Sequence, residues 1–293
     1  MGAKASSAGP HGVVVIDKPA GWTSHDIVAK SRGVIGTRKV GHSGTLDPDA
    51  TGVLVLGVGN ATRLLRFLTE LPKRYEGEIV LGTETTTLDA AGEITATHDM
   101  SAVTDDQVRA AANRLTGDLM QVPPMVSAIK IDGKRLHELA REGKEVDRPP
   151  RPVRVDRFDV EPVGGARGVW RCVVDCSSGT YIRSLAADLG TALGGGAHLR
   201  SLRRTSVGGF TLDDAGTIES PTLLPISAAV QHLESAIVDD DTAVLVGHGR
   251  VLPLEQLGVS GVGPWAVLGE DGVLLAVYES HPQGGKPTVV IPR

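Results

Sequence analysis

Aromatic residues are scarce in this chain, which has three Trp, three Tyr and three Phe among 293 residues. A core must therefore be packed mainly from Val, Leu, Ile and Ala, and the 41% hydrophobic content is sufficient for one. No apolar run reaches the roughly 18 residues that a membrane-spanning helix requires. Residues 1–10 are small and polar and contain no secretory hydrophobic segment. These absences predict a cytoplasmic protein with a disordered N-terminal tail and no membrane partner.

Cysteine is almost absent as well, and its two copies, Cys172 and Cys176, lie close together in the sequence WRCVVDC. That sequence is typical of a β-strand, on which residues four apart share a face but lie about 13 Å from each other. No second Cys or His pair completes a zinc site. The two cysteines are therefore predicted to be buried thiols, and no metal site is expected.

Charge is unevenly distributed along the chain, although the total is only −5. Residues 211–293 contain 3 Lys or Arg and 11 Asp or Glu, a net charge of −8, which leaves +3 on residues 1–210. Many basic residues cluster within one short stretch: Lys130, Lys134, Arg135, Arg141, Lys144, Arg148, Arg151, Arg154 and Arg157. Acidic residues are interleaved with them. The stretch can therefore form a surface for a polyanion or an ordinary solvated face, and composition alone leaves both open.

The pattern of apolar and turn residues predicts both strands and helices along the chain. Strands are expected at 13–16, 53–59, 74–83, 153–161 and 169–176. Helices are expected at 25–34 after an N-cap at Ser24, at 61–71, at 105–116 after an N-cap at Thr104, at 134–143 and at 181–193. The composition changes beyond about residue 237, which predicts a separate small C-terminal β-domain at 237–293.

The segment 41–52, GHSGTLDPDATG, is a long Gly-punctuated loop beside a predicted buried strand, and such loops are usually functional. Asp47-x-Asp49-x-Thr51 matches the motif of the haloacid-dehalogenase-like phosphatases, but that motif follows directly on a hydrophobic strand. The same string resembles the start of an EF-hand loop, but Val58 occupies the position of the bidentate Glu. A structural Asp-Pro turn, with its carboxylates bonded to local amides, is the third interpretation.

Five segments between residues 13 and 190 resemble the TruB family of tRNA pseudouridine synthases, in the family's order. The loop 41–52 matches the family's G-H-x-G-x-L-D-P-x-A-T-G signature throughout. The other four segments are VVVIDKPAGWTSHDIV (13–28), KRYEGEIVLGTETTTLDAAGE (73–93), VPPMVSAIKIDGKRLHELAREG (122–143) and CSSGTYIRSLAADLG (176–190). So many ordered matches are highly specific. The resemblance implies the pseudouridine synthase fold, an α+β fold with a mostly antiparallel mixed sheet and flanking helices, in a catalytic region at 11–230.

The resemblance also implies an enzyme that isomerises uridine to pseudouridine in the T-loop of tRNA, at tRNA position 55. The reaction breaks the N1–C1′ glycosidic bond, rotates the base and rejoins it through C5, so no cofactor is needed. A carboxylate must stabilise or trap the electron-poor sugar carbon or act as a base. The family places this role on the Asp of its L-D-P motif, here Asp47. Which of these steps the carboxylate performs stays open.

Further roles follow from the same resemblance. Arg183, in G-T-Y-I-R, is expected to support Asp47 as a fixed cation that lowers the pKa of its carboxyl. Tyr75 is expected to stack on the target base. His42 is expected to fill the gap left by the extruded uridine. Tyr181 aligns with a second tyrosine near the pocket, with a core position at the start of a helix as the alternative.

The remaining substrate contacts are assigned more broadly. Asp89 is expected to touch the sugar or base edge. Phosphate contacts are expected from Lys18, Lys130, Lys134 and Arg141. Residues 122–152 correspond to an RNA-gripping insertion that orders on binding. The C-terminal β-domain resembles the family's RNA-contacting, PUA-like tail domain, although its negative charge departs from such a role.

The expected partner is the T-stem-loop of tRNA. Neither an obligatory protein nor a guide RNA is expected, and the chain is expected to act as a monomer. Two rival functions remain. One is a non-catalytic tRNA-folding chaperone built on the same fold, which the intact Asp47 and Arg183 disfavour. The other is the Mg²⁺-dependent phosphatase suggested by the Asp47–Thr51 string.

Overall fold

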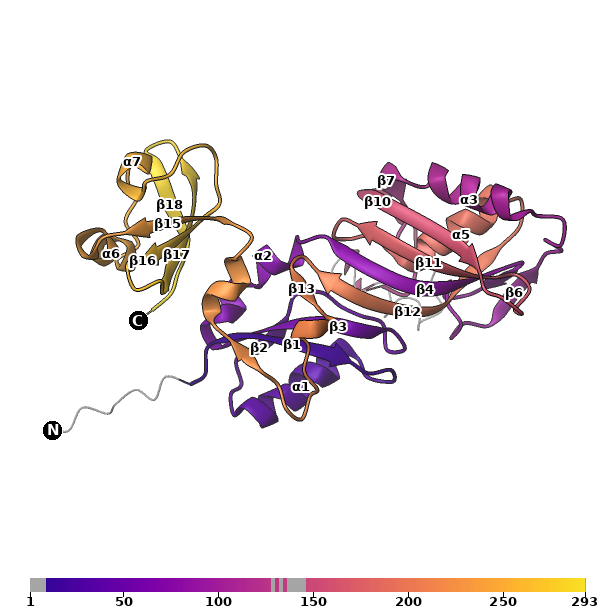
Figure 1. The fold of residues 1–293 in the computed structure, drawn as a ribbon, viewed down its shortest axis with the longest axis horizontal. Coiled ribbons are helices and arrows are strands. Elements are labelled where there is room, and N and C mark those ends of the chain that lie inside the picture. The colour runs from indigo at the N-terminus through magenta and orange to yellow at the C-terminus, as the bar shows by residue number, and fades with distance from the viewer. Residues whose placement is uncertain (1–8, 128–129, 132–133, 136–145, 293) are drawn as a thin grey trace. The chain divides into compact units, whose positions relative to one another are not determined.

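The chain folds as two units that are discontinuous in sequence (Figure 1). The computed structural model describes residues 9–127, 130–131, 134–135 and 146–292. The first unit consists of Met1–Pro48, Gly52–Glu70 and Val207–Arg293, and the second of Asp49–Thr51 and Leu71–Ser206. The loop that contains Asp47 therefore contributes residues Asp49–Thr51 to the second unit.

The sheet of the first unit is built around strand β1 (Gly12–Lys18), whose β-branched residues Val13–Ile16 are all buried. On one side β1 pairs antiparallel with β3 (Thr51–Val58), with Lys18 opposite Gly52. On its other side it pairs with β14 (Leu223–Leu224). Strand β2 (Val40–His42) adds to β3 and brings His42 opposite Leu56.

Helix α1 (Ser24–Ile35) begins with a capping box in which Thr23 and Asp26 bond each other's backbone N–H. The prediction that Ser24 is the N-cap was therefore wrong by one residue. Ser24 is instead the first helical residue and is buried. The helix expected at 61–71 is divided into a 3-10 turn, η1 (Gly59–Leu64), and the short α2 (Leu65–Thr69).

The C-terminal part of the chain forms a separate four-stranded sheet in the order β15 (Glu234–Val238), β16 (Trp265–Gly269), β17 (Leu274–His281) and β18 (Gly284–Val290). Trp265 and Tyr278 fill its core together with residues of α6 (Asp240–Gly247) and α7 (Leu254–Leu257). In the sequence, β15 is preceded by β13 (Phe210–Thr211), η2 (Leu212–Asp214) and η3 (Ile226–Val230).

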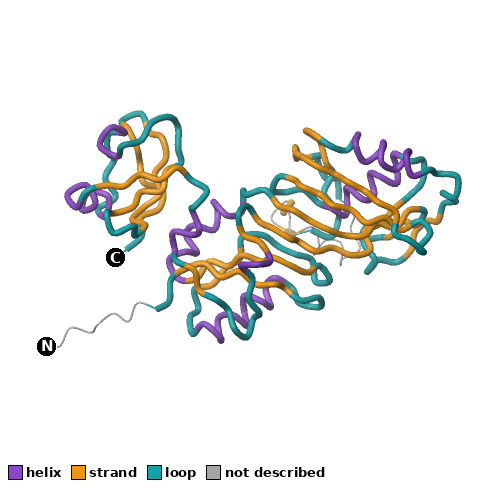
Figure 2. Tube along the Cα trace, viewed as in Figure 1, coloured by secondary structure: helices purple, strands orange, loops and turns teal. Residues whose placement is uncertain are grey.

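The second unit is dominated by a sheet in the order β12-β4-β11-β10-β7 (Figure 2). Its strands are β4 (Lys73–Leu81), β7 (Gly117–Gln121), β10 (Arg151–Pro162), β11 (Val169–Cys176) and β12 (Ala197–Val207). The pairs β4–β11, β11–β10 and β10–β7 are antiparallel, which leaves β7 at the edge. Two small hairpins, β5–β6 (Thr83–Thr85 with Ile94–Thr97) and β8–β9 (Lys130–Ile131 with Lys134–Arg135), accompany the sheet.

Helices α3 (Asp105–Arg114) and α5 (Ile182–Ala192) belong to this second unit, and α3 packs on β10 and contacts α5. Thr104 is the N-cap of α3, as predicted, and shares a capping box with Gln107. The helix expected at 134–143 is contradicted at its start, because Lys134 and Arg135 form β9. Its other residues lie outside the described part. None of the helices in the described ranges combines the length and apolar character needed to cross a bilayer.

Cys172 and Cys176 are both buried free thiols on β11, as predicted. Burial raises the pKa of Cys172 to about 12 and that of Cys176 to about 11, because a thiolate would be poorly solvated there. Both side chains therefore act as small core residues. The α+β class with a mostly antiparallel sheet and a small C-terminal β-sheet, expected from the sequence, is confirmed.

Candidate active site

The residues on both sides of Asp47 are tied to the start of the chain within the first unit. Ser24 Oγ accepts from Leu46 N–H at 2.9 Å and donates to Leu46 C=O at 3.2 Å. Pro48 C=O accepts from Gly21 N–H at 3.0 Å. Asp47, which is half-buried, therefore projects from a backbone anchored at its preceding and following residues. Preorganisation of this kind is what a catalytic carboxylate requires.

Lys18 contributes to the same anchor, and its predicted role as a phosphate contact is wrong in this structure. The side chain is fully buried at 0% exposure. Its ammonium donates to three carbonyl oxygens, those of Pro19 at 2.9 Å, Trp22 at 2.7 Å and Pro48 at 2.9 Å. An ammonium enclosed by backbone oxygens cannot reach a phosphate in solvent. Lys18 instead holds the turn after β1 against the residue that follows Asp47.

His42 ends β2 and is half-buried. Its ring meets that of His25 on α1 edge to face, with 5.3 Å between the ring centroids and an interplanar angle of 83°. The contact gives the His42 ring one defined orientation on the first unit. The predicted insertion of this ring into an RNA stack stays a prediction.

Arg183 and Asp89, both predicted site residues, are brought together in the second unit. The Arg183 side chain is 5% exposed, and its Nη1 lies 3.4 Å from Asp89 Oδ2. The guanidinium also donates to Thr87 C=O at 3.1 Å and Val126 C=O at 2.8 Å. A buried guanidinium keeps its charge, so this arrangement fixes a cation at a set place in the unit.

The turn that presents Asp89 is itself strained. Leu88 has a φ of 61°, in the left-handed region that residues with a branched side chain rarely adopt. Asp89 Oδ1 accepts from Thr87 Oγ1 at 2.5 Å and Ala91 N–H at 3.1 Å, so the carboxylate is locked within its own turn. Strain that is held by surrounding hydrogen bonds is typical of functional sites.

Two tyrosines were predicted at the site, and both belong to the second unit. Tyr75 lies on β4 opposite Val174 and is 8% exposed. A base that stacks on this ring must itself be withdrawn from water, as an extruded nucleotide is. Tyr181 is the N-cap of α5, and it precedes Arg183 by two residues. This is the helix-start position considered in the sequence, and it does not exclude a substrate contact.

Thr51, the first residue of β3, is held within the second unit. Its Oγ1 accepts a hydrogen bond from Arg203 Nη1 of β12 at 3.2 Å. Gly52 follows with a φ of 102°, a conformation that favours glycine. The loop is therefore anchored near its C-terminal end as well as on both sides of Asp47.

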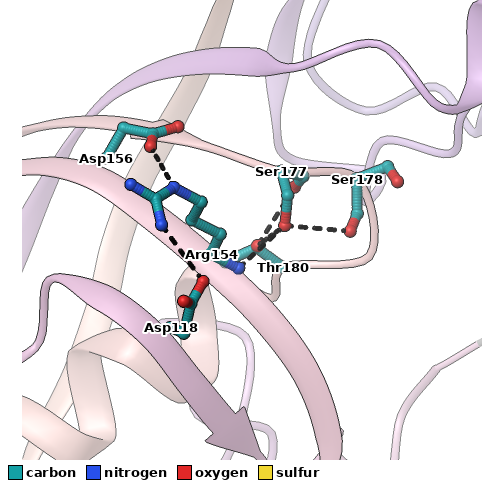
Figure 3. Close-up of polar contacts among 6 residues, drawn as sticks. All are labelled: Asp118, Arg154, Asp156, Ser177, Ser178 and Thr180. Carbon is teal, nitrogen blue, oxygen red and sulfur yellow. Dashed lines mark hydrogen bonds and ion pairs between the residues drawn. The ribbon is translucent and has the colours of Figure 1, made fainter.

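Only some basic residues of the central stretch lie in the described part of the chain. Lys130 and Lys134 lie on the β8–β9 hairpin, and Arg141 lies outside the described residues. Arg154 donates to Asp156 at 2.7 Å and Asp118 at 3.2 Å (Figure 3). Arg157 pairs with Asp159. These two arginines are therefore neutralised by neighbouring carboxylates, which favours the solvated-face interpretation for this part of the stretch.

Sequence reasoning missed the anchoring residues Ser24 and Arg203. For Ser24 the sequence contained a signal, since Thr23-x-x-Asp26 is a capping-box pattern. This pattern makes Thr23 the N-cap, so the Ser24 hydroxyl is not needed for capping. The contact of Arg203 with Thr51 spans 152 residues of sequence, so no local pattern could predict it.

Two family models match the chain. Residues 32–182 match the TruB family pseudouridylate synthase N-terminal domain, and residues 183–256 match the tRNA pseudouridylate synthase B C-terminal domain. A protein of Rhodococcus jostii named tRNA pseudouridine synthase B is 48% identical, over 96% of this chain and 93% of the relative. A protein of Streptomyces coelicolor with the same name is also 48% identical, over 96% and 97%.

Solved structures resemble the chain over most of its length. A Cbf5–Nop10–Gar1 complex contains a chain that is 26% identical, with a TM-score of 0.73 over 96% of this chain and 85% of that one. A chain in an H/ACA ribonucleoprotein bound to a substrate RNA containing 2′-deoxyuridine has a TM-score of 0.72 at 24% identity, which supports the fold alone.

Proposed function

Since the chain belongs to the TruB family of pseudouridylate synthases, we propose that it isomerises uridine 55 in the T-loop of tRNA to pseudouridine, with Asp47 as the essential carboxylate. The observation that carries the proposal is the loop 41–52, which agrees with the family signature at every fixed position and is anchored on both sides of Asp47.

The reaction is an isomerisation in which one bond to the sugar replaces another. The N1–C1′ bond breaks, the uracil rotates, C5 bonds to C1′, and the proton lost from C5 is balanced by one gained at N1. Asp47 stabilises or traps the electron-poor C1′ or acts as a base during this exchange. Neither electrons nor an external group are consumed, so the chemistry requires no cofactor.

The other side chains bind and orient the substrate. Arg183, buried and held by Asp89, supplies a permanent positive charge. Tyr75 stacks on the extruded base, and His42 occupies the space that the base leaves. Tyr181 and Asp89 contact the nucleotide, and Lys130, Lys134 and Arg141 contact phosphates. Lys18 is removed from this set because it is buried.

The proposed partner is the T-stem-loop of tRNA alone. The bacterial relatives are named as tRNA enzymes, and we propose that this chain resembles them in acting as a monomer without a protein or guide-RNA partner. We further propose that residues 11–230 form the catalytic region, that 122–152 grip the RNA, and that 237–293 form a PUA-like domain. Residues 237–293 contain 3 Lys or Arg and 7 Asp or Glu, and this net charge of −4 makes that domain a weak phosphate binder.

The test is tritium release from tRNA transcripts labelled at C5 of uridine. Wild-type protein should release tritium from a normal transcript and not from one in which the T-loop uridine is replaced by cytidine. Asp47→Asn should bind the tRNA but release nothing, whereas Asp49→Asn, at the exposed neighbouring carboxylate, should stay active. Turnover by Asp47→Asn would exclude the assignment. Full activity in EDTA separates this reaction from that of a Mg²⁺-dependent phosphatase.

A further inference from the structure

Gln121 is a buried polar residue to which the proposed reaction assigns no role. It is the last residue of the edge strand β7, where its backbone pairs with Arg151 of β10, and it is 3% exposed. Burial of a side-chain amide is unfavourable unless both its donor and its acceptor are satisfied. The partners of this amide therefore indicate what the residue does.

Both ends of the Gln121 amide bond the backbone of one residue, Tyr181. Oε1 accepts from Tyr181 N–H at 2.8 Å, and Nε2 donates to Tyr181 C=O at 3.1 Å. The side chain thus bonds the backbone of Tyr181, 60 positions away in sequence, in the way that the backbone of a neighbouring strand would. The backbone fixes the orientation of the amide, because an N–H can only donate and a C=O can only accept.

The backbone of Tyr181 sets the direction in which helix α5 begins. It is the N-cap of α5, and no side chain caps the helix at this position. Arg183 lies within the first turn of that helix, two residues further on. A second tie from the residue after Gln121 acts on the same turn, since Ser184 Oγ donates to Val122 C=O at 3.0 Å.

The segment before Tyr181 is held less directly. Ser177 Oγ accepts from Arg154 N–H at 2.9 Å, and Thr180 Oγ1 donates to Ser177 C=O at 3.0 Å (Figure 3). Between them Gly179 has a φ of 82°. These bonds shape the turn at 177–180 without using the backbone of Tyr181, whose C=O accepts from Leu185 N–H of α5 at 3.1 Å as well as from Gln121 Nε2.

We propose that Gln121 is a positioning residue for the isomerisation: through the backbone of Tyr181 it sets the direction in which the start of α5 presents Tyr181 and Arg183 to the substrate. This inference rests on the proposed function. Gln121 has no part in the chemical step itself, so its loss should slow the reaction of bound tRNA and should not weaken tRNA binding.

The first experiment uses Gln121→Met, which keeps length and burial but removes both hydrogen bonds. Single-turnover pseudouridine formation at saturating enzyme should slow by about tenfold or more, while the Kd for tRNA changes less than about threefold. Met120→Leu, at the exposed neighbouring position, is the matched control and should match wild type in both measurements. A folded Gln121→Met with the wild-type rate would overturn the proposal, as would an equal loss of rate and affinity.

A second variant keeps the proposal testable if Gln121→Met does not fold. In Gln121→Glu the ionised carboxylate still accepts from Tyr181 N–H but repels Tyr181 C=O. The protonated carboxyl reproduces both bonds of the amide. The rate of Gln121→Glu relative to wild type should therefore rise as pH falls from 8 to 5. A constant ratio over that pH range would overturn the proposal. In both experiments wild type must form pseudouridine; if it does not, the proposed function fails rather than this inference.

Discussion

Arg183 and Asp89 form an ion pair with 3.4 Å between Nη1 and Oδ2, in which the arginine side chain is 5% exposed and the aspartate side chain 24%. Carbonyl oxygens of Thr87 and Val126 also accept hydrogen bonds from the guanidinium. A buried charge is strongly destabilised when one partner is removed, because its donors lose solvation without compensation. The position of Arg183 therefore depends on Asp89 as well as on its own helix.

Asp89→Asn keeps the shape of the side chain and removes its charge. We expect the isomerisation rate to fall about tenfold or more and the free energy of unfolding to fall by about 1–3 kcal/mol. Single-turnover tritium release and urea denaturation measure the two effects. Asp99→Asn is the control, because that exposed carboxylate accepts from Ser101 N–H within its own turn and should leave the rate unchanged. Unaltered rate and stability in Asp89→Asn would show that the pair does not position Arg183.

Lys18→Met tests the reassignment of Lys18 from phosphate contact to loop anchor. The variant leaves the carbonyls of Pro19, Trp22 and Pro48 without their buried donor, so we expect a loss of about 3 kcal/mol or more in unfolding free energy. The salt dependence of tRNA binding should not change. If Lys18 contacted a phosphate, its replacement in Lys18→Met would instead lower the slope of log Kd against log salt by about one unit. That result, with unaltered stability, would restore the original assignment.

Arg154 tests whether the arginines of β10 that pair with neighbouring carboxylates contribute to tRNA binding. Arg154→Gln should leave tRNA affinity and its salt slope unchanged, because Asp118 and Asp156 already compensate the charge. The double variant Asp118→Asn with Asp156→Asn frees the guanidinium and should tighten binding of any polyanion, tRNA included. Filter binding at several salt concentrations measures both. Weaker binding by Arg154→Gln alone would mean that RNA displaces the carboxylates.

The buried thiols predict a specific pH response. The pKa values of about 12 for Cys172 and about 11 for Cys176 lie above the ordinary value of 9.0. Between those limits the unfolded chain loses thiol protons while the folded chain retains them, so stability is full below pH 9 and falls as pH rises through 11. Cys172→Ala with Cys176→Ala should reduce the slope of stability against pH in that range. Native protein should also resist thiol reagents at pH 8; rapid labelling there would contradict the burial.

Much of the fold and the site could be read from sequence because the relevant signals are local. The Val13–Ile16 run, the Thr104 cap and the strand around Cys172 each depend on near neighbours. The family motifs placed Asp89 and Arg183 in one site, and the structure pairs them. Motifs could not show the direction of a side chain. Lysine is usually a surface residue, and only the tertiary structure shows that the ammonium of Lys18 is enclosed.

The residues that cover the second edge of strand β1 are synthesised late. Residues 12–18 pair with β3 early, but the other edge of β1 is completed by β14 and by the bonds between Asp17, Val15 and Gly216. At a translation rate of about 5–20 residues per second, roughly 160 residues and about 8–30 s separate β3 from Gly216. All of Leu71–Ser206 leaves the ribosome within that interval. The nascent protein therefore has an open, strongly apolar strand edge while its second unit is being made, and that edge is where we expect a chaperone to act or aggregation to begin.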